Sequence, residues 1–207
     1  MLKEAKKVVY LFAFLTVIIW CLSFLNKILL PVVIFLSILT LLLINFFRDP
    51  NRVVKKDSKI LYSPADGKIF EVFETENTYC IKIFMSVFDV HVQRSPVDGT
   101  IKDIVYKKGK FIPAGRFLSD VVNEQNIIEL ETDEKNKIIV KQIAGILAKR
   151  IVCWVKKNQR VFQGEKIGAI LLGSQVNIEF PKSKYKILVN KNQKVYAGIT
   201  ALAVKVY

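Results

Sequence analysis

Three side chains suited to acid–base and nucleophilic chemistry stand in short, turn-rich stretches of the sequence. They are Asp66 in SPADG (residues 63–67), His91 in FDVHVQRSP (88–96) and Ser174 in LGSQV (172–176). Histidine is the side chain whose ordinary pKa lies near neutrality, and His91 is the only one in the chain. Proton transfer at neutral pH is therefore expected to use His91, with Asp66 as the carboxylate that orients it. Ser174 is the candidate nucleophile, and it needs a base and an oxyanion site to react.

The order Asp66, His91, Ser174 also raises the alternative of a plain serine hydrolase. The sequence lacks a Gly-x-Ser-x-Gly elbow, and Ser174 precedes a predicted strand rather than a helix, so this alternative is disfavoured. It stays open because catalytic triads are recognised by geometry. The three cysteines share no close spacing, which predicts a reducing compartment, no disulfide framework and no metal site.

The elements that must position these residues begin with two uncharged apolar runs, residues 8–25 and 28–47. As helices, each run reaches roughly 27–30 Å, about the thickness of the hydrocarbon core of a bilayer. Asn26, Lys27 and Pro31 suit a tight turn between two antiparallel helices. A signal peptide would have a shorter apolar core and no second span directly after it. The sequence therefore predicts a membrane hairpin over residues 1–47, with a single re-entrant or interfacial unit as the alternative.

Basic residues flank the hairpin on both outer sides, whereas the turn holds only one, Lys27. They are Lys3, Lys6 and Lys7 before it and Arg48, Arg52, Lys55 and Lys56 after it. The positive-inside rule places both ends in the cytoplasm, so the body is expected on the cytoplasmic face of the cell membrane. The net charge of the 207-residue chain is +14, and residues 1–47 contain only four basic residues and one acidic residue. A basic body beside the membrane predicts attraction to an anionic bilayer. Nucleic acid is not an expected partner, because no helix-turn-helix, zinc-finger or RNA-binding pattern is present.

The body reads as mostly β structure. Strands are predicted over residues 68–74, 79–87, 100–106, 126–131, 137–143, 150–155, 175–180 and 194–206. Many short strands separated by turn signals indicate a compact sandwich or barrel. The stretch SPADGKI at 63–69 recurs as SPVDGTI at 95–101, which looks like the paired hairpins of a barrel-sandwich hybrid. Residues 160–168 resemble the turn before the modified site of biotinyl carriers, but no lysine stands at a hairpin tip.

Four stretches taken in order resemble the phosphatidylserine decarboxylases, in the short form with an N-terminal membrane hairpin. They are FFRDP at 46–50, SPADG, FDVHVQRSP and LGSQV; YKKGKF at 106–111 with Ala114, and NEQN at 123–126, are also similar to that family. The resemblance implies that residues 48–207 form a pyruvoyl-dependent decarboxylase domain. It implies self-cleavage between Gly173 and Ser174 into chains 1–173 and 174–207, which stay associated, with Ser174 becoming the pyruvoyl group. Gly173 has no side chain to hinder attack on its carbonyl.

The same resemblance implies the reaction. Phosphatidylserine in an anionic bilayer would form a Schiff base with the pyruvoyl group and lose CO₂. His91 would protonate the resulting carbanion, and phosphatidylethanolamine would be released. Longer members of the family have two histidines three residues apart, and here the second position holds Arg94. Arg94 is expected either to contact the lipid phosphate or carboxylate or to be a surface or turn residue.

Three other functions stay as alternatives: an archaetidylserine decarboxylase, a non-enzymatic membrane-anchored adaptor of biotinyl-like fold, and an inactive relative. The joint presence of Ser174, His91 and Asp66 argues against the inactive relative, and the missing tip lysine argues against the adaptor. The sequence leaves the oligomeric state open.

Overall fold

The computed structural model describes residues 1–2, 5–113, 118–146, 150–171 and 174–206. The chain divides into two compact units, Met1–Asn51 and Arg52–Tyr207. The first unit is helical, and the second is mainly β structure with one short α-helix among the described residues.

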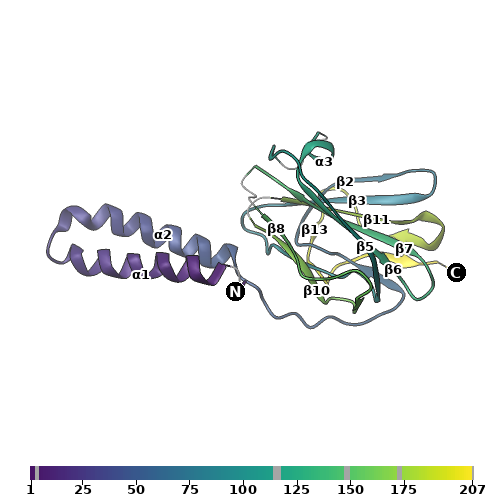
Figure 1. Cartoon of the computed structure of the whole chain (residues 1–207), viewed down its shortest axis with the longest axis horizontal. Helices are drawn as coiled ribbons and strands as arrows, with labels where there is room; N and C mark the ends of the chain where they lie inside the picture. Colours follow the sequence, from purple (N-terminus) through teal and green to yellow (C-terminus); the bar gives the residue numbers. More distant parts are fainter. Residues whose placement is uncertain (3–4, 114–117, 147–149, 172–173, 207) are drawn as a thin grey trace. The chain divides into compact units, whose positions relative to one another are not determined.

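The first unit is an antiparallel helical hairpin. Helix α1 (Lys6–Ser23) is followed by a single 3₁₀ turn, η2 (Lys27–Leu29), and by α2 (Leu30–Phe46) (Figure 1). The Asn26 side chain accepts a hydrogen bond from the Ile28 N–H at 3.0 Å, and Pro31 lies in the first turn of α2, so the predicted turn is confirmed. The hydroxyls of Thr16 and Thr40 join the two helices at 3.0 Å. Both helices are long and apolar enough to cross a membrane.

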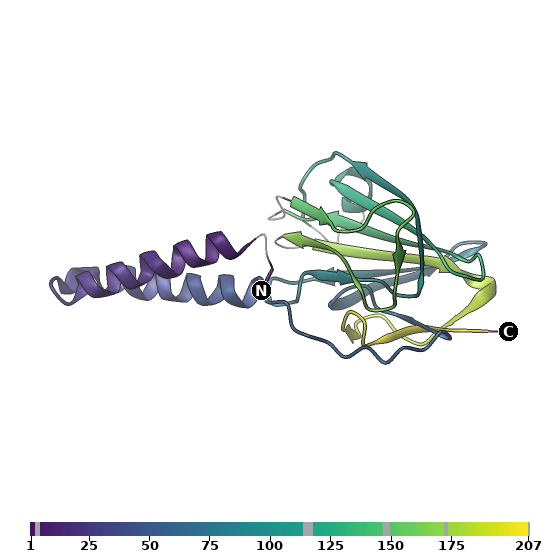
Figure 2. The ribbon, with the colours of Figure 1, turned by 60° about the horizontal axis from the view of Figure 1, so that its bottom comes forward.

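The second unit contains one large sheet and two small ones. The large sheet has eight strands in the order β13-β2-β3-β11-β7-β6-β5-β9, and the small sheets have the orders β1-β14-β12 and β4-β10-β8. The bounds are β1 Ile60–Tyr62, β2 Gly67–Glu74, β3 Thr78–Met85, β4 Val92–Arg94, β5 Gly99–Lys107, α3 Ser119–Val122, β6 Gln125–Glu131, β7 Lys137–Ala144, β8 Arg150–Cys153, β9 Arg160–Val161, β10 Lys166–Leu171, β11 Ser174–Pro181, η3 Lys182–Lys184, β12 Tyr185–Ile187, β13 Lys194–Val195 and β14 Ala201–Lys205. The large sheet curls, and the strands wrap around one apolar interior (Figures 1 and 2).

The two repeated turns are related by an internal pseudo-symmetry. Ser63 donates its hydroxyl hydrogen bond to the Ala65 carbonyl at 2.7 Å, and Ser95 does the same to Val97 at 2.7 Å. The Ser63 carbonyl accepts from the Gly198 N–H at 2.8 Å, as the Ser95 carbonyl does from Gly164 at 2.8 Å.

The strands beyond the turns follow the same pattern, because β13 pairs with β2 at Gly67 as β9 pairs with β5 at Gly99. Gly164 and Gly198 both adopt positive φ, +82° and +69°, which favours glycine. The predicted paired hairpins are therefore present, and the expected fold class, a two-helix hairpin followed by a mainly β domain of this type, is confirmed.

Strand β11 shows how sequence alternation builds the interior. Val176, Ile178 and Phe180 are buried in the core, as their spacing at every second residue predicts. On the opposite face lie Gln175, Asn177 and Glu179.

One strand prediction is wrong, and several short strands were not predicted. Residues 194–206 are not one strand: β13 ends at Val195, a turn closed by the Tyr196 N–H to Thr200 Oγ1 hydrogen bond of 2.9 Å follows, and β14 joins another sheet. Strands β1, β4, β9, β10 and β12 were not predicted; residues 160–168, which include β9 and the start of β10, were interpreted as a turn. A Cβ atom at Gly168 would lie 2.4 Å from the Val152 carbonyl oxygen, so this glycine permits the close approach of β8.

Candidate active site

Ser174 begins β11 and faces the interior. Its Cα partners across the sheet are Met85, the last residue of β3, and Ala144, the last residue of β7. Cross-strand partners share a face, and all three residues are fully buried. The Ser174 hydroxyl donates to the Met85 sulfur at 3.4 Å. The candidate nucleophile is therefore held inside the domain, at the first residue of a central strand of the large sheet.

His91 lies directly before β4 and is also fully buried. Its Nδ1 atom is 2.8 Å from the backbone carbonyl oxygen of Asp89, and its own carbonyl accepts from the Ile170 N–H at 3.1 Å. A carbonyl partner makes Nδ1 the protonated nitrogen of the neutral ring, which leaves Nε2 as the atom that can accept a proton.

The loop between β3 and His91 is held by the Asp89 side chain. The carboxylate accepts from the Ser86 N–H at 2.9 Å and from the Ser86 hydroxyl at 2.8 Å, and it also pairs with Lys194. Burial alone would raise the pKa of Asp89, but the hydrogen bonds from Lys194 and Ser86 outweigh it and lower the pKa. Asp89 is thus an ionised clamp beside His91.

Met85 is where the Ser174 and His91 segments meet. Its sulfur accepts from Ser174 and, at 3.6 Å, from the Gln93 side-chain amide, which also donates to the His91 carbonyl at 3.0 Å. Gln93 continues into a buried chain of amides: Gln142 donates to Gln93 at 2.8 Å, and Asn126 donates to Gln142 at 2.7 Å. The interior next to Ser174 is therefore polar, hydrogen-bonded and shielded from water.

Asp66 is not hydrogen-bonded to His91. Both carboxylate oxygens accept from the Arg52 guanidinium at 2.6 Å, and Oδ1 also accepts from the Ala197 N–H at 2.8 Å. Arg52 and Asp66 are both buried. Asp66 fixes the 63–67 turn, whose Pro64 carbonyl accepts from the Arg94 N–H at 2.9 Å. Its connection to His91 therefore runs through the backbone of β4.

Arg94 is neither a surface residue nor a turn residue. It is the last residue of β4 and is buried, and its guanidinium donates to the Gly164 carbonyl at 2.9 Å. Gly164 is one of the two positive-φ glycines whose N–H groups donate to the repeated turns.

A second polar group lies on the outer face of the sheet, directly behind Ser174. We call Glu71, Lys82, Asp120, Gln175 and Asn177 the outer polar cluster. Lys82 pairs with Glu71 and with Asp120, each at 2.7 Å, and the Gln175 amide donates to Asp120 and, at 2.7 Å, to Asn177. Helix α3, which carries Asp120, lies outside the sheet (Figure 1). Burial would lower the pKa of Lys82, but its hydrogen bonds to Asp120 and Glu71 outweigh this and raise it. A charged network thus holds the residue next to Ser174.

Gly173, the expected partner of Ser174 in cleavage, and Ala114 lie outside the described residues. Among the residues that the structure describes, no group of three or more histidine, cysteine or acidic side chains could hold a metal ion.

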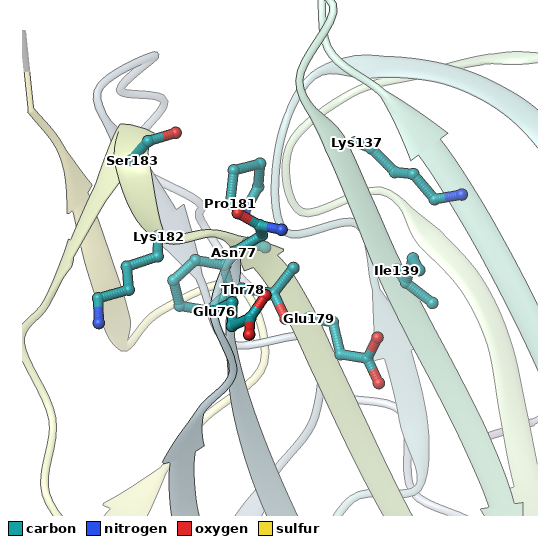
Figure 3. A pocket seen from close by; sticks show the side chains of 10 residues that line it. Glu76, Asn77, Thr78, Lys137, Ile139, Glu179, Pro181, Lys182 and Ser183 are labelled. Carbon is teal, nitrogen blue, oxygen red and sulfur yellow. The ribbon is translucent and has the colours of Figure 1, made fainter.

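A pocket of about 470 Å³ lies away from these residues, at the other end of β3 and β11. Figure 3 shows its lining, which includes Thr78, Glu179 and Lys182. Thr78 pairs with Pro181, seven register positions from the Met85–Ser174 pair. At about 3.3 Å per residue this pocket is roughly 23 Å from Ser174 along the strands, so it is separate from the candidate active site.

The sequence did not reveal the residues that hold the site. Arg52 was considered only as a charge flanking the hairpin, and Lys82, Asp120 and Gln142 were not singled out. Lys82 and Gln142 interrupt otherwise apolar strands, and a buried polar residue in such a strand is the signal that could have drawn attention to them.

The comparisons with known proteins agree on one family. The family model described as phosphatidylserine decarboxylase matches residues 39–203. A phosphatidylserine decarboxylase proenzyme of Carboxydothermus hydrogenoformans is 39% identical over 172 residues, 80% of this chain and 80% of that protein. The proenzyme of the same name from Ehrlichia canis is 44% identical over 173 residues, 80% of this chain and 76% of its own length. That from Pelagibacter ubique is 42% identical over 170 residues, 77% of this chain and 78% of its own.

Proposed function

Because this chain belongs to the phosphatidylserine decarboxylase family, a family of carboxy-lyases, we propose that it converts phosphatidylserine to phosphatidylethanolamine and CO₂ with a pyruvoyl group made from its own Ser174. The observation that carries the proposal is the burial of Ser174 at the start of β11, in a water-shielded interior that it shares with His91.

The first step is self-cleavage. The Ser174 hydroxyl attacks the Gly173 carbonyl, and the amide bond becomes an ester as the proton moves to the Ser174 nitrogen. Elimination across Cα and Cβ releases the Gly173 carboxylate and leaves dehydroalanine. Water then replaces its nitrogen, which departs as ammonia, and a ketone remains. His91 is the group that takes the hydroxyl proton, since its Nδ1 is fixed by the Asp89 carbonyl and Nε2 is the basic atom.

The residues at Ser174 suit a pyruvoyl group. The group would stay attached to the Gln175 nitrogen, and the outer polar cluster fixes Gln175 from behind. When present, it supplies a carbonyl that condenses with the substrate amine and accepts the electron pair released with CO₂. The buried interior excludes water from that reaction.

Three further residues have roles in the proposal. His91 delivers the proton that replaces CO₂. Asp66 fixes the turn that bonds to β4, and so positions His91 through Pro64 and Arg94. Arg94, whose family counterpart in longer members is a second histidine, offers a guanidinium to the lipid phosphate or carboxylate.

The two product chains would remain together. Strand β11 of the short chain lies between β3 and β7 of the long chain, with eight register pairs to β3 and six to β7. Strands β13 and β14 also pair with β2 and β1 of the long chain. Cleavage before Ser174 breaks one peptide bond and none of these ladders.

The helical hairpin supports a membrane location for the protein, and the proposed lipid substrate is found in the membrane. By the positive-inside rule, the basic residues at both outer ends of the hairpin support a position of the catalytic domain on the cytoplasmic face.

The test is decarboxylation by the full chain in phosphatidylserine-containing bilayers, measured as CO₂ released from carboxyl-labelled lipid. The wild type should release CO₂ and form the ethanolamine lipid. Ser174→Ala should abolish both, and His91→Gln should lower the rate by about 10²–10⁴-fold per pyruvoyl-containing chain. Arg94→Lys should raise KM more than it lowers kcat.

Two results would overturn the proposal: wild-type release no greater than that of Ser174→Ala, or release only from an archaetidylserine with ether-linked chains. The second result would leave the chemistry in place and assign it to the alternative lipid.

A further inference from the structure

Three loops lie at the end of the large sheet where β11 begins and its neighbours β3 and β7 end. We call this end of the sheet the Ser174 edge. Ser174 pairs with the last residues of β3 and β7, and the first residue of β6, Gln125, pairs with the last residue of β5, Lys107. Gln125 also pairs with Ile143 near the end of β7. Residues 86–91, 108–113, 118–124 and 145–146 therefore all lie outside the strands at the Ser174 edge.

These loops expose large apolar side chains. Six of them, which we call the apolar rim, are 40% to 72% exposed: Val87, Phe88, Phe111, Leu118, Val121 and Ile146. Single exposed apolar residues are ordinary on protein surfaces, but a group drawn from three loops around one site marks an interaction surface.

Hydrogen bonds hold the loops that present the rim. The Lys110 N–H donates to the Val122 carbonyl at 2.7 Å, and the Glu124 N–H donates to the Lys110 carbonyl at 3.0 Å. The Asn123 side chain bonds to both backbone groups of Ile112. Beside Phe88, the Asp89 carboxylate holds its loop through Ser86. Phe88, Phe111 and Val121 thus project from segments whose backbone is hydrogen-bonded.

The charge left at this edge is positive. Lys107, Lys108 and Lys110 are exposed in the loop that carries Phe111, and none of them pairs with a carboxylate in the part of the chain that the structure describes. The acidic residues nearby are already engaged: Asp89 with Lys194, Asp120 with Lys82, and Glu124 with the Tyr106 hydroxyl. Apolar side chains flanked by lysines are typical of surfaces that enter the headgroup layer of an anionic bilayer.

We propose that the apolar rim is a second membrane-docking surface, separate from the helical hairpin. The rim enters the interfacial layer of an anionic bilayer, Lys107, Lys108 and Lys110 meet the lipid phosphates, and the Ser174 edge is turned toward the lipid. The hairpin ties the chain to the membrane, and the rim selects which edge of the β domain faces it. This inference deepens the proposed function, since it describes how a lipid substrate reaches Ser174.

A depth measurement tests the docking without requiring activity. Val121→Cys is labelled with an environment-sensitive fluorophore in the full chain carrying Cys21→Ser, Cys153→Ser and Ser174→Ala, in bilayers containing phosphatidylserine. Cys80 is kept, because it is buried and burial raises the pKa of its thiol to about 12, so it does not react. Phe162→Cys is the matched control, because Phe162 is also exposed but follows β9, which pairs with the other end of β5.

The label at 121 should be quenched by spin-labelled lipid and protected from an aqueous quencher, while the label at 162 behaves in the opposite way. Two outcomes overturn the proposal: a label at 121 that is open to the aqueous quencher, or one protected only at high protein density in neutral bilayers. The second outcome would assign the rim to contact with another copy of the chain.

Kinetics give an independent reading. The triple variant Phe88→Ser, Leu118→Ser and Val121→Ser should lose roughly tenfold or more in kcat/KM on bilayer phosphatidylserine, with little change on a short-chain phosphatidylserine dissolved as monomers. Phe162→Ser should match the wild type on both substrates. Equal losses on both substrates would overturn docking. A wild type inactive on both would instead count against the proposed function, and the fluorescence result would still stand.

Discussion

At the scale of single residues, two aspartates stand at equivalent positions of the repeated turns but differ in their partners. Asp66 accepts from the Ala197 N–H at 2.8 Å, and Asp98, its counterpart in the repeat, accepts from the Gln163 N–H at 2.6 Å. The turn itself therefore explains an aspartate at both positions. Only Asp66 also binds a guanidinium, that of Arg52, and only Asp66 lies in the turn bonded to Arg94 beside His91.

The Arg52–Asp66 pair should be costly to break from one side. Arg52→Ala leaves a buried carboxylate without its bidentate partner, so the free energy of unfolding should fall by about 3–5 kcal/mol. The measurement is urea unfolding of the detergent-solubilised full chain, in a Ser174→Ala background that keeps it whole.

Arg160→Ala is the matched control, because Arg160 makes a bidentate pair with Asp133 that is open to solvent. This variant should unfold at the same urea concentration as the parent protein, since exposed ion pairs add little to stability. Equal losses in the two variants would contradict the buried role of Arg52.

At the scale of elements, β11 presents alternate residues to two polar environments. Ser174 faces the interior with Met85, and Gln175 faces the outer polar cluster with Asp120. Helix α3 thus contacts β11 from the outer face of the sheet. Because Gln175, next to Ser174, is fixed on the outer face, a displacement of α3 should alter the geometry of the proposed cleavage site.

Asp120→Ala should slow cleavage before Ser174 by roughly 10–100-fold, because Gln175 loses one of its two side-chain acceptors and Lys82 loses one of its two carboxylates. The rate is read from gel bands of newly synthesised full chain. Glu179→Ala removes a different ion pair of the same sheet face, that with Lys141, and should leave the rate unchanged. If the two variants are slowed alike, Asp120 has no special role.

The Asp89 carboxylate, which holds the loop from β3 to His91, should make the free energy of unfolding depend on pH. The pKa of Asp89 is lowered in the folded state. The ionised side chain therefore stabilises the fold at pH values above the ordinary aspartate pKa, and this stabilisation is lost as the pH falls through the lower pKa of the folded state. Asp89→Ala should therefore unfold about 1–3 kcal/mol more easily at neutral pH. The difference from the parent protein should begin to shrink as the pH falls below about 4 and should vanish only below the lowered pKa of the folded state. A difference that is constant with pH would show that the carboxylate charge is not involved.

At the scale of the whole molecule, sequence patterns determined what could be foreseen. Apolar length predicts the hairpin, and alternation predicts β11, β7 and the other long strands, because these signals are local. The repeat of SPADG and SPVDG predicts the paired turns. The long-range contacts could not be foreseen: nothing near Arg52 indicates Asp66, and nothing near Asp120 indicates Gln175, since folding alone brings them together. Local signals also mislead where an apolar pattern runs through a turn, as at Gly198.

The processed molecule is expected to be two chains sharing one sheet, and the most direct test of this account is the intact mass of the purified full chain beside Ser174→Ala. The account predicts two wild-type fragments, the smaller spanning residues 174–207 and lighter than its sequence by one ammonia, and a whole Ser174→Ala chain. A wild type that remains a single chain of 207 residues would contradict it.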